Sequence, residues 1–226
     1  MTSPEWDLFM ENYYGDPYTM WHDGIDETSV TRLKDEERDR AEDMLIASLE
    51  EGSHYGAIGL RELRSTKALP YLEERLKSSA GTLAVEIAVA LCLIKQTLDY
   101  VPYIITALQK SVFWSDRIRA AKALRRFPTK EVVETLFQVV AKDSDYLVRN
   151  HASETILFLH GLQPSISSHK EIFGHMIVDY DKENETSTRN ASEHYNESAK
   201  MLKRLVEKDG KLRKGPIILD IWSWKD

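Results

Sequence analysis

Residues 68–76 read ALPYLEERL and residues 101–108 read VPYIITAL, so an apolar-Pro-Tyr-apolar motif recurs after 32 positions. A second column keeps a similar period, with spacings of 31, 33 and 32 residues between Leu60, Leu91, Leu124 and Ile156. Two columns in phase at this period indicate a repeat protein, in which stacked units of secondary structure bury a shared core. The sequence therefore predicts an all-α fold, an α-α superhelix of four to five helix pairs.

Apolar periodicity predicts where the individual helices lie. In residues 35–51 the apolar positions follow the i, i+3, i+4 spacing of one buried helix face, and Gly52 ends the pattern. Gly, Pro, Ser, Thr or Asp separates the further helices, which are predicted at residues 53–64, 66–79, 82–96, 98–111, 115–127, 129–142 and 145–160. Such short connections predict antiparallel neighbouring helices.

The paired helices carry a resemblance to a known family. The first helices contain ALPYLEERL, VPYIITAL and, at residues 132–140, VVETLFQVV; the second helices contain AVEIAVALCLI, RIRAAKALRRF and YLVRNHASETIL. This pattern resembles the bacterial HEAT-like repeat of the phycobilin-lyase type, in which xLPxLxxxL precedes VRxxAxxAL. The resemblance covers residues 35–160 and implies a fold more than a function, because such repeats serve as scaffolds, inhibitors, pigment-lyase subunits, hydroxylases and DNA glycosylases.

The repeats are expected to belong to one domain spanning residues 1–226, with terminal segments that depart from the repeat. Residues 1–34 are expected to form an aromatic cap over the first repeat, because residues 3–21 hold six aromatic side chains; the alternative is an aromatic anchor for a partner. Residues 161–226 are expected to supply capping helices and a docked apolar tail at 216–224. The polar residues 181–189 are expected to form a mobile linker.

Composition restricts the environment and the class of partner. The chain has 226 residues, is 42% hydrophobic and 30% charged, and carries a formal charge of −7, which disfavours nonspecific binding to nucleic acid or to an anionic membrane. No run of 18 apolar residues and no basic, apolar leader is present in this sequence, so a cytoplasmic protein is expected. The single cysteine, Cys92, agrees with a reducing compartment.

Alignment of the second helices predicts a binding surface. Their small or apolar columns, among them Leu60, Leu91, Leu124 and Ile156, are expected to face neighbouring helices. The opposite stripe lines the concave groove in HEAT-like proteins, as the resemblance implies, and its mixture of charged and aromatic groups suits another protein. The predicted partner-binding residues are Tyr55, Glu86, Arg119, Lys122, Arg126, His151, Glu154 and Phe158. The alternative is an ordinary solvated helix surface.

Within this stripe, residues 117–126 concentrate five cations, Arg117, Arg119, Lys122, Arg125 and Arg126. Guanidinium groups in such a cluster can bind carboxylates or phosphates in bidentate fashion. The alternative is internal neutralisation by nearby carboxylates, for which the candidates in sequence are Asp116, Glu131, Glu134 and Asp145. The sequence leaves both open.

No catalytic residue, metal ligand or cofactor site is predicted. The seven histidines form neither an HExxH motif nor a His-Glu pair, which argues against the HEAT-like di-iron hydroxylases. Trp114 and Asp116 resemble the residue types that face the lesion in HEAT-like alkylpurine DNA glycosylases, but those enzymes have basic grooves. We expect Trp114 to pack in a loop, Ser115 or Asp116 to cap the next helix, and Cys92 to be a core thiol.

These observations together predict a non-enzymatic module that binds another protein through its concave groove. A more specific hypothesis is a cytosolic inhibitor or immunity protein, because an acidic surface complements a cationic toxin or effector. The alternative is a HEAT-like enzyme or enzyme subunit, either pigment-lyase-like or glycosylase-like. The oligomeric state is not predicted.

Overall fold

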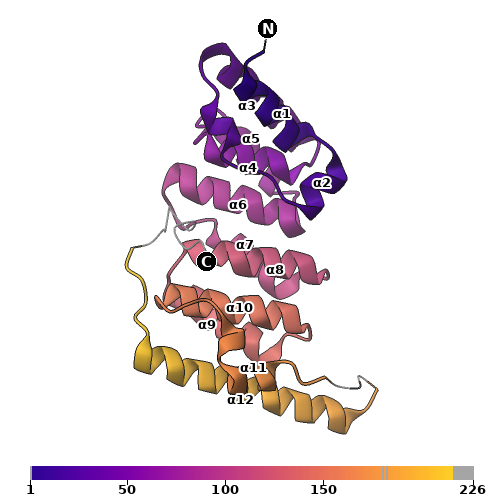
Figure 1. Ribbon diagram of the computed structural model, residues 1–226, viewed down its shortest axis with the longest axis vertical. Coiled ribbons are helices and arrows are strands. Elements are labelled where there is room, and N and C mark those ends of the chain that lie inside the picture. Colours follow the sequence, from indigo (N-terminus) through magenta and orange to yellow (C-terminus); the bar gives the residue numbers. More distant parts are fainter. Residues whose placement is uncertain (1, 180, 182, 216–226) are drawn as a thin grey trace. The chain divides into compact units, whose positions relative to one another are not determined.

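The computed structural model describes residues 2–179, 181 and 183–215, and its contacts divide the chain into two compact units. Unit 1 is Met1–Tyr100 and unit 2 is Val101–Asp226. Across the described residues the regular structure is α-helix with short 3-10 turns and no β-strand (Figure 1). The predicted all-α helical repeat class is therefore confirmed, whereas the prediction of a single domain over 1–226 stays a prediction.

Unit 1 begins with short elements and continues as two helix pairs. The short elements are α1 (Pro4–Tyr14), α2 (Pro17–His22) and the 3-10 turn η1 (Ser29–Arg32). The pairs are α3 (Asp35–Glu50) with α4 (His54–Glu62), and α5 (Leu69–Leu76) with α6 (Gly81–Lys95). Helix α4 contacts α3 on one side and α6 on the other, so the second helices form the inner layer of this stack (Figure 1).

Unit 2 repeats the arrangement with two further pairs. The pairs are α7 (Val101–Lys110) with α8 (Trp114–Ala123), and α9 (Lys130–Lys142) with α10 (Tyr146–Leu159); η2 (Leu124–Arg126) tightens the end of α8. Then follow η3 (Ile166–Ser168), α11 (Lys170–Met176) and the long α12 (Glu185–Asp209). Helix α10 contacts α8 and α9, and α12 covers α9 and α11.

The prediction that residues 181–189 form a mobile linker is wrong from Glu185 onward, because helix α12 begins at that residue. Its N-cap is Asn184, whose side-chain oxygen accepts hydrogen bonds from the amides of Thr186 and Ser187 at 3.0 and 3.1 Å. Asn is among the best N-cap residues, so this polar stretch starts a helix where its composition indicated a loop. The apolar tail expected to dock at 216–224 lies outside the described residues.

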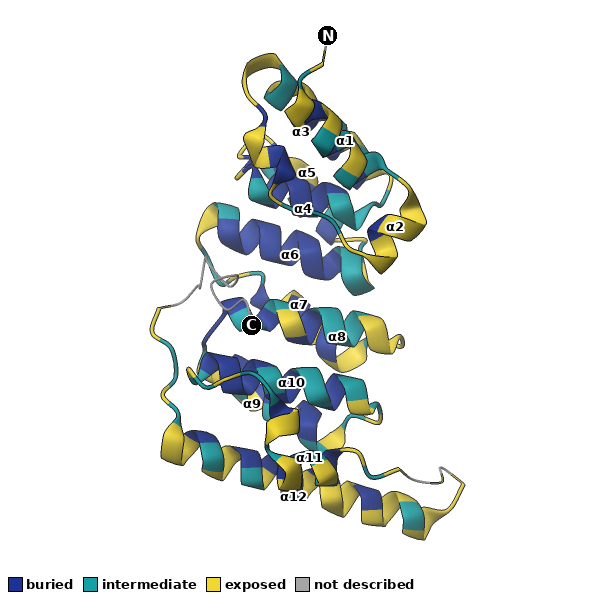
Figure 2. Cartoon of the chain, viewed as in Figure 1, coloured by how far each residue is buried: buried dark blue, intermediate teal, exposed yellow. Residues whose placement is uncertain are grey.

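The predicted buried columns form the core of each unit. Leu60 and Leu91 in unit 1, and Leu124 and Ile156 in unit 2, are all fully buried. Helices α6 and α10 are buried along most of their length (Figure 2). Ile94 and Ala123 are half-buried exceptions near the ends of their helices.

Small residues in these columns let the helices approach closely, and Gly56 shows how closely. A Cβ atom at this position would lie 2.7 Å from the carbonyl oxygen of Leu45 and 2.8 Å from the amide nitrogen of Leu49 in α3. Both neighbours are backbone atoms, which cannot turn aside as a flexible side chain would. Gly56 is therefore required by the α3–α4 contact, as expected where packed helices place small residues at their crossing.

The N-terminal aromatic residues divide into a buried and an exposed group. The Ser3 hydroxyl accepts a hydrogen bond from the Trp6 amide at 3.0 Å and starts α1, whose Trp6, Phe9 and Tyr13 are buried. The expectation that the aromatic residues cover the first repeat as a cap is wrong for Tyr18 and Trp21 in α2, which are 67% and 76% exposed. Helix α1 packs on η1 and α4, whereas α2 has few such contacts.

Replacing Ala90 with Phe tests the packing of the inner layer. Ala90 is fully buried in α6, so the larger ring must displace neighbouring side chains or backbone and should lower the free energy of unfolding by about 1–3 kcal/mol or more. A urea melt followed by circular dichroism measures the loss. Ala123→Phe, at a half-buried position, should cost less. An unchanged midpoint for Ala90→Phe would show that the column is assigned to the wrong helix face.

Candidate functional site

The residues predicted to bind a partner are divided between the two units. Tyr55 and Glu86 lie in α4 and α6 of unit 1. The other six lie in α8, η2 and α10 of unit 2: Arg119, Lys122, Arg126, His151, Glu154 and Phe158. Their burial decides which of them can meet another molecule.

Glu86 is not a surface residue, and its assignment to the groove is wrong. Its side chain is 3% exposed and accepts a hydrogen bond from Nη1 of Arg61 at 2.8 Å. Arg61, itself 5% exposed, also donates from Nε to Glu62 at 2.8 Å and from Nη2 to Glu27. Burial would lower the pKa of Arg61, but the three carboxylates raise it above its ordinary value. Glu86 therefore belongs to a buried ion cluster that joins α4 to α6.

Tyr55 also has a local structural role. It is half-buried, and its hydroxyl donates a hydrogen bond to the carbonyl oxygen of Met20 at 3.3 Å. Met20 is the buried residue of α2. Tyr55 thus fastens the short helix α2 to α4.

Phe158 and Arg126 are buried as well, so the expectation that they face a groove is wrong. Phe158 is 2% exposed, and the Cζ atom of the Arg213 guanidinium lies over its ring, 4.5 Å from the ring centroid. Arg213 also donates to the carbonyl oxygen of Phe158 at 2.7 Å. Arg126 is 5% exposed because the 3-10 turn η2 packs against α10. The repeat pattern could not predict either burial, because Arg213 lies outside the repeats and the 3-10 turn η2 departs from the regular helix geometry.

Five charged or titratable residues remain at the accessible side of these helices, and we name them the α8–α10 surface: Arg119, Lys122, Arg125, His151 and Glu154. Glu154 lies at its centre, with Oε2 at 3.4 Å from Nη2 of Arg125 and 3.0 Å from Nδ1 of His151. Lys122 is exposed and the others are half-buried. Four of the five were predicted from sequence; Arg125 was recognised only as a member of the cation cluster.

The α8–α10 surface has an excess of positive charge. Although Lys122 is exposed, its pKa is lowered, first by the desolvation that nearby side chains impose on its ammonium and then by Arg125 and Arg119. Partial burial would raise the pKa of Glu154, but the hydrogen bond with His151 and the charge of Arg125 hold it below its ordinary value. By composition the α8–α10 surface holds three cations, one carboxylate and one histidine, so it is suited to a carboxylate-bearing partner.

An exposed apolar loop borders this surface, and sequence reasoning missed it. It consists of Val112 and Phe113, which follow α7, and Trp114, which begins α8; they are 88%, 70% and 51% exposed. The expectation that Trp114 packs in a loop and that Ser115 or Asp116 caps the helix is wrong. Trp114 is the first residue of α8, and its N-cap is Phe113, which makes no capping side-chain bond. The sequence did contain a signal for this loop, because three consecutive apolar residues stand at a predicted connection between two helices.

Arg117 connects this apolar loop to the end of α9. Its Nη1 donates to the carbonyl oxygens of Ser111 and Val112 at 2.9 and 3.1 Å, while Nε and Nη2 bind the two carboxylate oxygens of Asp143 at 2.9 and 3.1 Å. The side chains of Arg117 and Asp143 are largely buried. Internal pairing of the cations is thus present for Arg117 and Arg125, but with Asp143 and Glu154, neither of which was among the four carboxylates expected.

The other sequence-derived assignments concern chemistry. Cys92 is buried, as expected of a core thiol, and burial raises its pKa to about 12. At neutral pH the thiol is protonated and therefore a poor nucleophile. Among the residues that the structure describes, no three His, Cys, Asp or Glu side chains are grouped to hold a metal ion. Over the same residues, no helix has both the length and the apolar composition that crossing a membrane requires.

Comparison with known proteins supports the repeat assignment. Residues 101–165 match the family model described as HEAT repeats. The match spans α7 to α10 and so includes every residue of the α8–α10 surface and the apolar loop. The resemblance to HEAT-like repeats is confirmed, and the bacterial phycobilin-lyase type stays a prediction. Neither the comparison with curated proteins nor that with solved structures gives a match.

Arg61→Met tests the structural role of the buried ion cluster. The substitution leaves Glu86 buried without its counter-charge, so the free energy of unfolding should fall by about 3–5 kcal/mol. The double variant Arg61→Met with Glu86→Leu should recover much of the loss, because it removes the unpaired charge too. Lys67→Met, which breaks an exposed pair with Asp43, should have no measurable effect. Failure of the double variant to recover stability would contradict this account.

Arg117→Lys tests whether the guanidinium fixes the apolar loop. Lysine keeps the charge but cannot bond Asp143 and two carbonyl oxygens together, so the amides of residues 111–115 should exchange their hydrogens at least about tenfold faster. Hydrogen exchange with mass spectrometry measures this. Arg119→Lys is the matched control and should leave the exchange unchanged. Equal protection in Arg117→Lys and in the original chain would show that other contacts hold the loop.

Proposed function

We propose that this chain is a non-catalytic protein-binding module that meets its partner with the apolar loop and the α8–α10 surface. HEAT repeats are in general protein-interaction modules. The observation that carries the proposal is the exposure of Val112, Phe113 and Trp114 on a loop held by Arg117. Contiguous exposed apolar side chains mark an interaction site in a folded protein.

The physical properties of the loop suit the centre of an interface. Trp is among the residues most enriched at binding hot spots, and aromatic residues are enriched in interface cores. Because Arg117 already orders the loop, binding costs less conformational entropy than it would for a mobile segment. Trp114, Ile118 and Lys122 recur every four residues along one face of α8, so a partner on the loop also reaches the α8–α10 surface.

The non-catalytic part of the proposal has support from the candidates for chemistry. The one thiol, Cys92, is protonated and buried. Trp114 and Asp116, the pair that resembles glycosylase residues, start a helix at an exposed turn. Their positions favour contact with a protein surface over insertion of a base into a pocket.

The more specific proposal is a cytoplasmic inhibitor, such as an immunity protein, of a cationic toxin or effector. Its support is the distribution of charge: residues 1–100 carry 20 acidic and 10 basic side chains, whereas residues 101–226 carry 17 acidic and 20 basic ones. The acidity that would attract a cationic effector is therefore a property of unit 1, while the α8–α10 surface suits carboxylates.

Affinity purification with matched variants tests the proposed binding surface. The original chain, the double variant Phe113→Ser with Trp114→Ser, and the control Tyr103→Ala are used as baits in lysate of the source cell. Tyr103 is 45% exposed on the first helix α7 and so controls for loss of an aromatic residue. A partner identified by mass spectrometry should be retained by the control and lost by the double variant. Calorimetry should then show at least about a tenfold weaker dissociation constant, or 1.4 kcal/mol.

Two outcomes decide the proposal. Partner binding unchanged in the double variant would remove the apolar loop from the interface. For the inhibitor proposal, the activity of the identified partner is assayed with increasing amounts of the chain. Stoichiometric inhibition supports it, and full partner activity in the assembled complex contradicts it.

A further inference from the structure

Helix α2 presents an aromatic face to solvent, separate from the surface in unit 2. Tyr18 and Trp21 are 67% and 76% exposed, with ring centroids 6.3 Å apart. The His22 ring stacks on Tyr18 at 5.5 Å with an interplanar angle of 17°. The helix is exposed along most of its length (Figure 2). Its open rings offer negative π-faces to an incoming group.

The aromatic face is held in place by contacts on the opposite side of α2. Met20 is 8% exposed, and its carbonyl oxygen accepts the hydrogen bond of Tyr55. At the start of the helix, Asp16 accepts hydrogen bonds from the amide and hydroxyl of Thr19 at 2.9 and 3.0 Å. The rings therefore stand on a short helix that is capped and anchored.

The segment of the chain that carries this face is acidic. Residues 1–31 contain no Lys or Arg but seven acidic residues. Asp16 and Asp23 cap the two ends of α2 and are exposed, and Glu11 is exposed in α1. Asp23 lies 2.7 Å from the Nδ1 of His22, and Asp26 further along is paired with Arg32 at 2.6 Å. Aromatic faces and carboxylates both attract cations, whereas nucleic acid and anionic lipid are repelled by this charge.

We propose that the aromatic face of α2 docks a Lys- or Arg-bearing segment of a protein partner. Side-chain cations of the segment stack on Trp21 and Tyr18, and a neighbouring cation pairs with Asp23. This proposal rests on the protein-binding function proposed above, but it assigns a second surface, in unit 1, and a partner chemistry opposite to that of the α8–α10 surface. Arginine fits the site better than lysine because its planar guanidinium stacks on rings and binds carboxylates at once.

The test uses a fluorescein-labelled peptide of alternating Arg and Gly, titrated with the full chain and followed by fluorescence anisotropy. Tyr18→Leu with Trp21→Leu keeps apolar side chains but removes the π-faces, and should weaken binding at least about tenfold. Phe113→Leu with Trp114→Leu removes two exposed aromatic residues from unit 2 and should stay within about twofold of the original chain. Asp23→Asn should weaken binding, most strongly at low ionic strength; Asp16 is left intact because it caps α2.

The outcomes separate this surface from the one in unit 2. Three results would each overturn the proposal. The Tyr18 and Trp21 variant could bind the Arg-Gly peptide as tightly as the original chain does, or the original chain could fail to bind it. The original chain could also bind a Glu-Gly peptide as tightly as the Arg-Gly peptide. Both substituted residues are exposed, so an unchanged urea midpoint shows that any loss is not unfolding. If the peptide binds α2 while no partner depends on Phe113 and Trp114, the surface proposed in unit 2 fails and this one stands.

Discussion

Close approach of the second helices to their neighbours is the constraint on which both units depend. A single helix pair cannot cover its own apolar face, so α4 and α6, and likewise α8 and α10, bury that face against one another. The distance from a second helix to its neighbours depends on small residues. At Gly56 even a methyl group would meet the backbone of α3, and Ala90, Ala120 and Ala152 are fully buried in the corresponding columns. Alternating these small residues with Leu and Ile gives each helix a surface that interlocks with the next.

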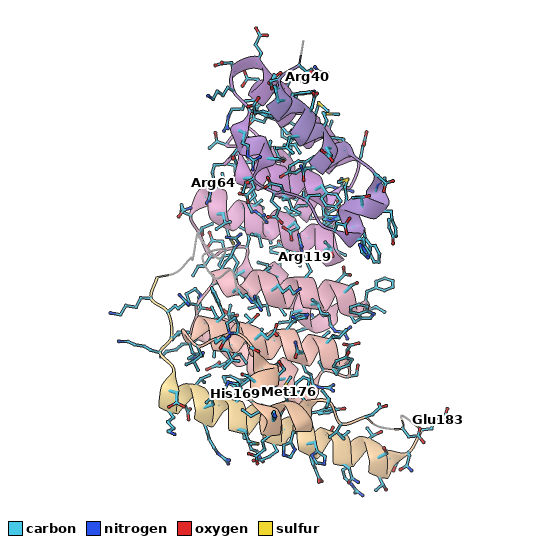
Figure 3. All side chains as sticks on the ribbon, viewed as in Figure 1. Arg40, Arg64, Arg119, His169, Met176 and Glu183 are labelled. Atoms are coloured by element: carbon cyan, nitrogen blue, oxygen red, sulfur yellow. The ribbon has the colours of Figure 1, made fainter. Side chains whose placement is uncertain are left out.

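Buried arginines fasten the ends of these stacks. In unit 1, Arg61 gathers carboxylates from α4, from α6 and from the turn before η1. In unit 2, Arg149 of the Val-Arg repeat motif is 2% exposed and donates from Nε to the carbonyl oxygen of Met176 at 3.0 Å. Met176 ends α11, which packs against α12 (Figure 3). The Arg149 guanidinium lies 3.6 Å from the ring centroid of Tyr195 in α12. Its planar group thus joins α10, α11 and α12 where a point charge would reach one partner.

The two units differ in the chemistry that they present. Unit 1 concentrates the acidity of the chain and exposes aromatic rings on α2, whereas unit 2 exposes an apolar loop beside a cation-rich surface. The net charge of −7 conceals this difference, because it averages an acidic half with a slightly basic one. Partner chemistry in a repeat protein is therefore better considered surface by surface. Segments of opposite charge can be recognised at separate places on one chain.

Periodicity in the sequence determined the all-α class, most helix positions and the buried columns, because these depend on which residues recur every 31 to 33 positions. It also identified Arg119, Lys122, His151 and Glu154 as neighbours, since adjacent repeats place equivalent positions side by side. Tertiary structure alone decided the burial of Glu86, Arg126 and Phe158. Their covering groups are Arg61, the η2–α10 contact and Arg213, and none of these follows the repeat. A repeat pattern reports only the face that recurs, whereas burial also depends on chain segments that cross a helix once.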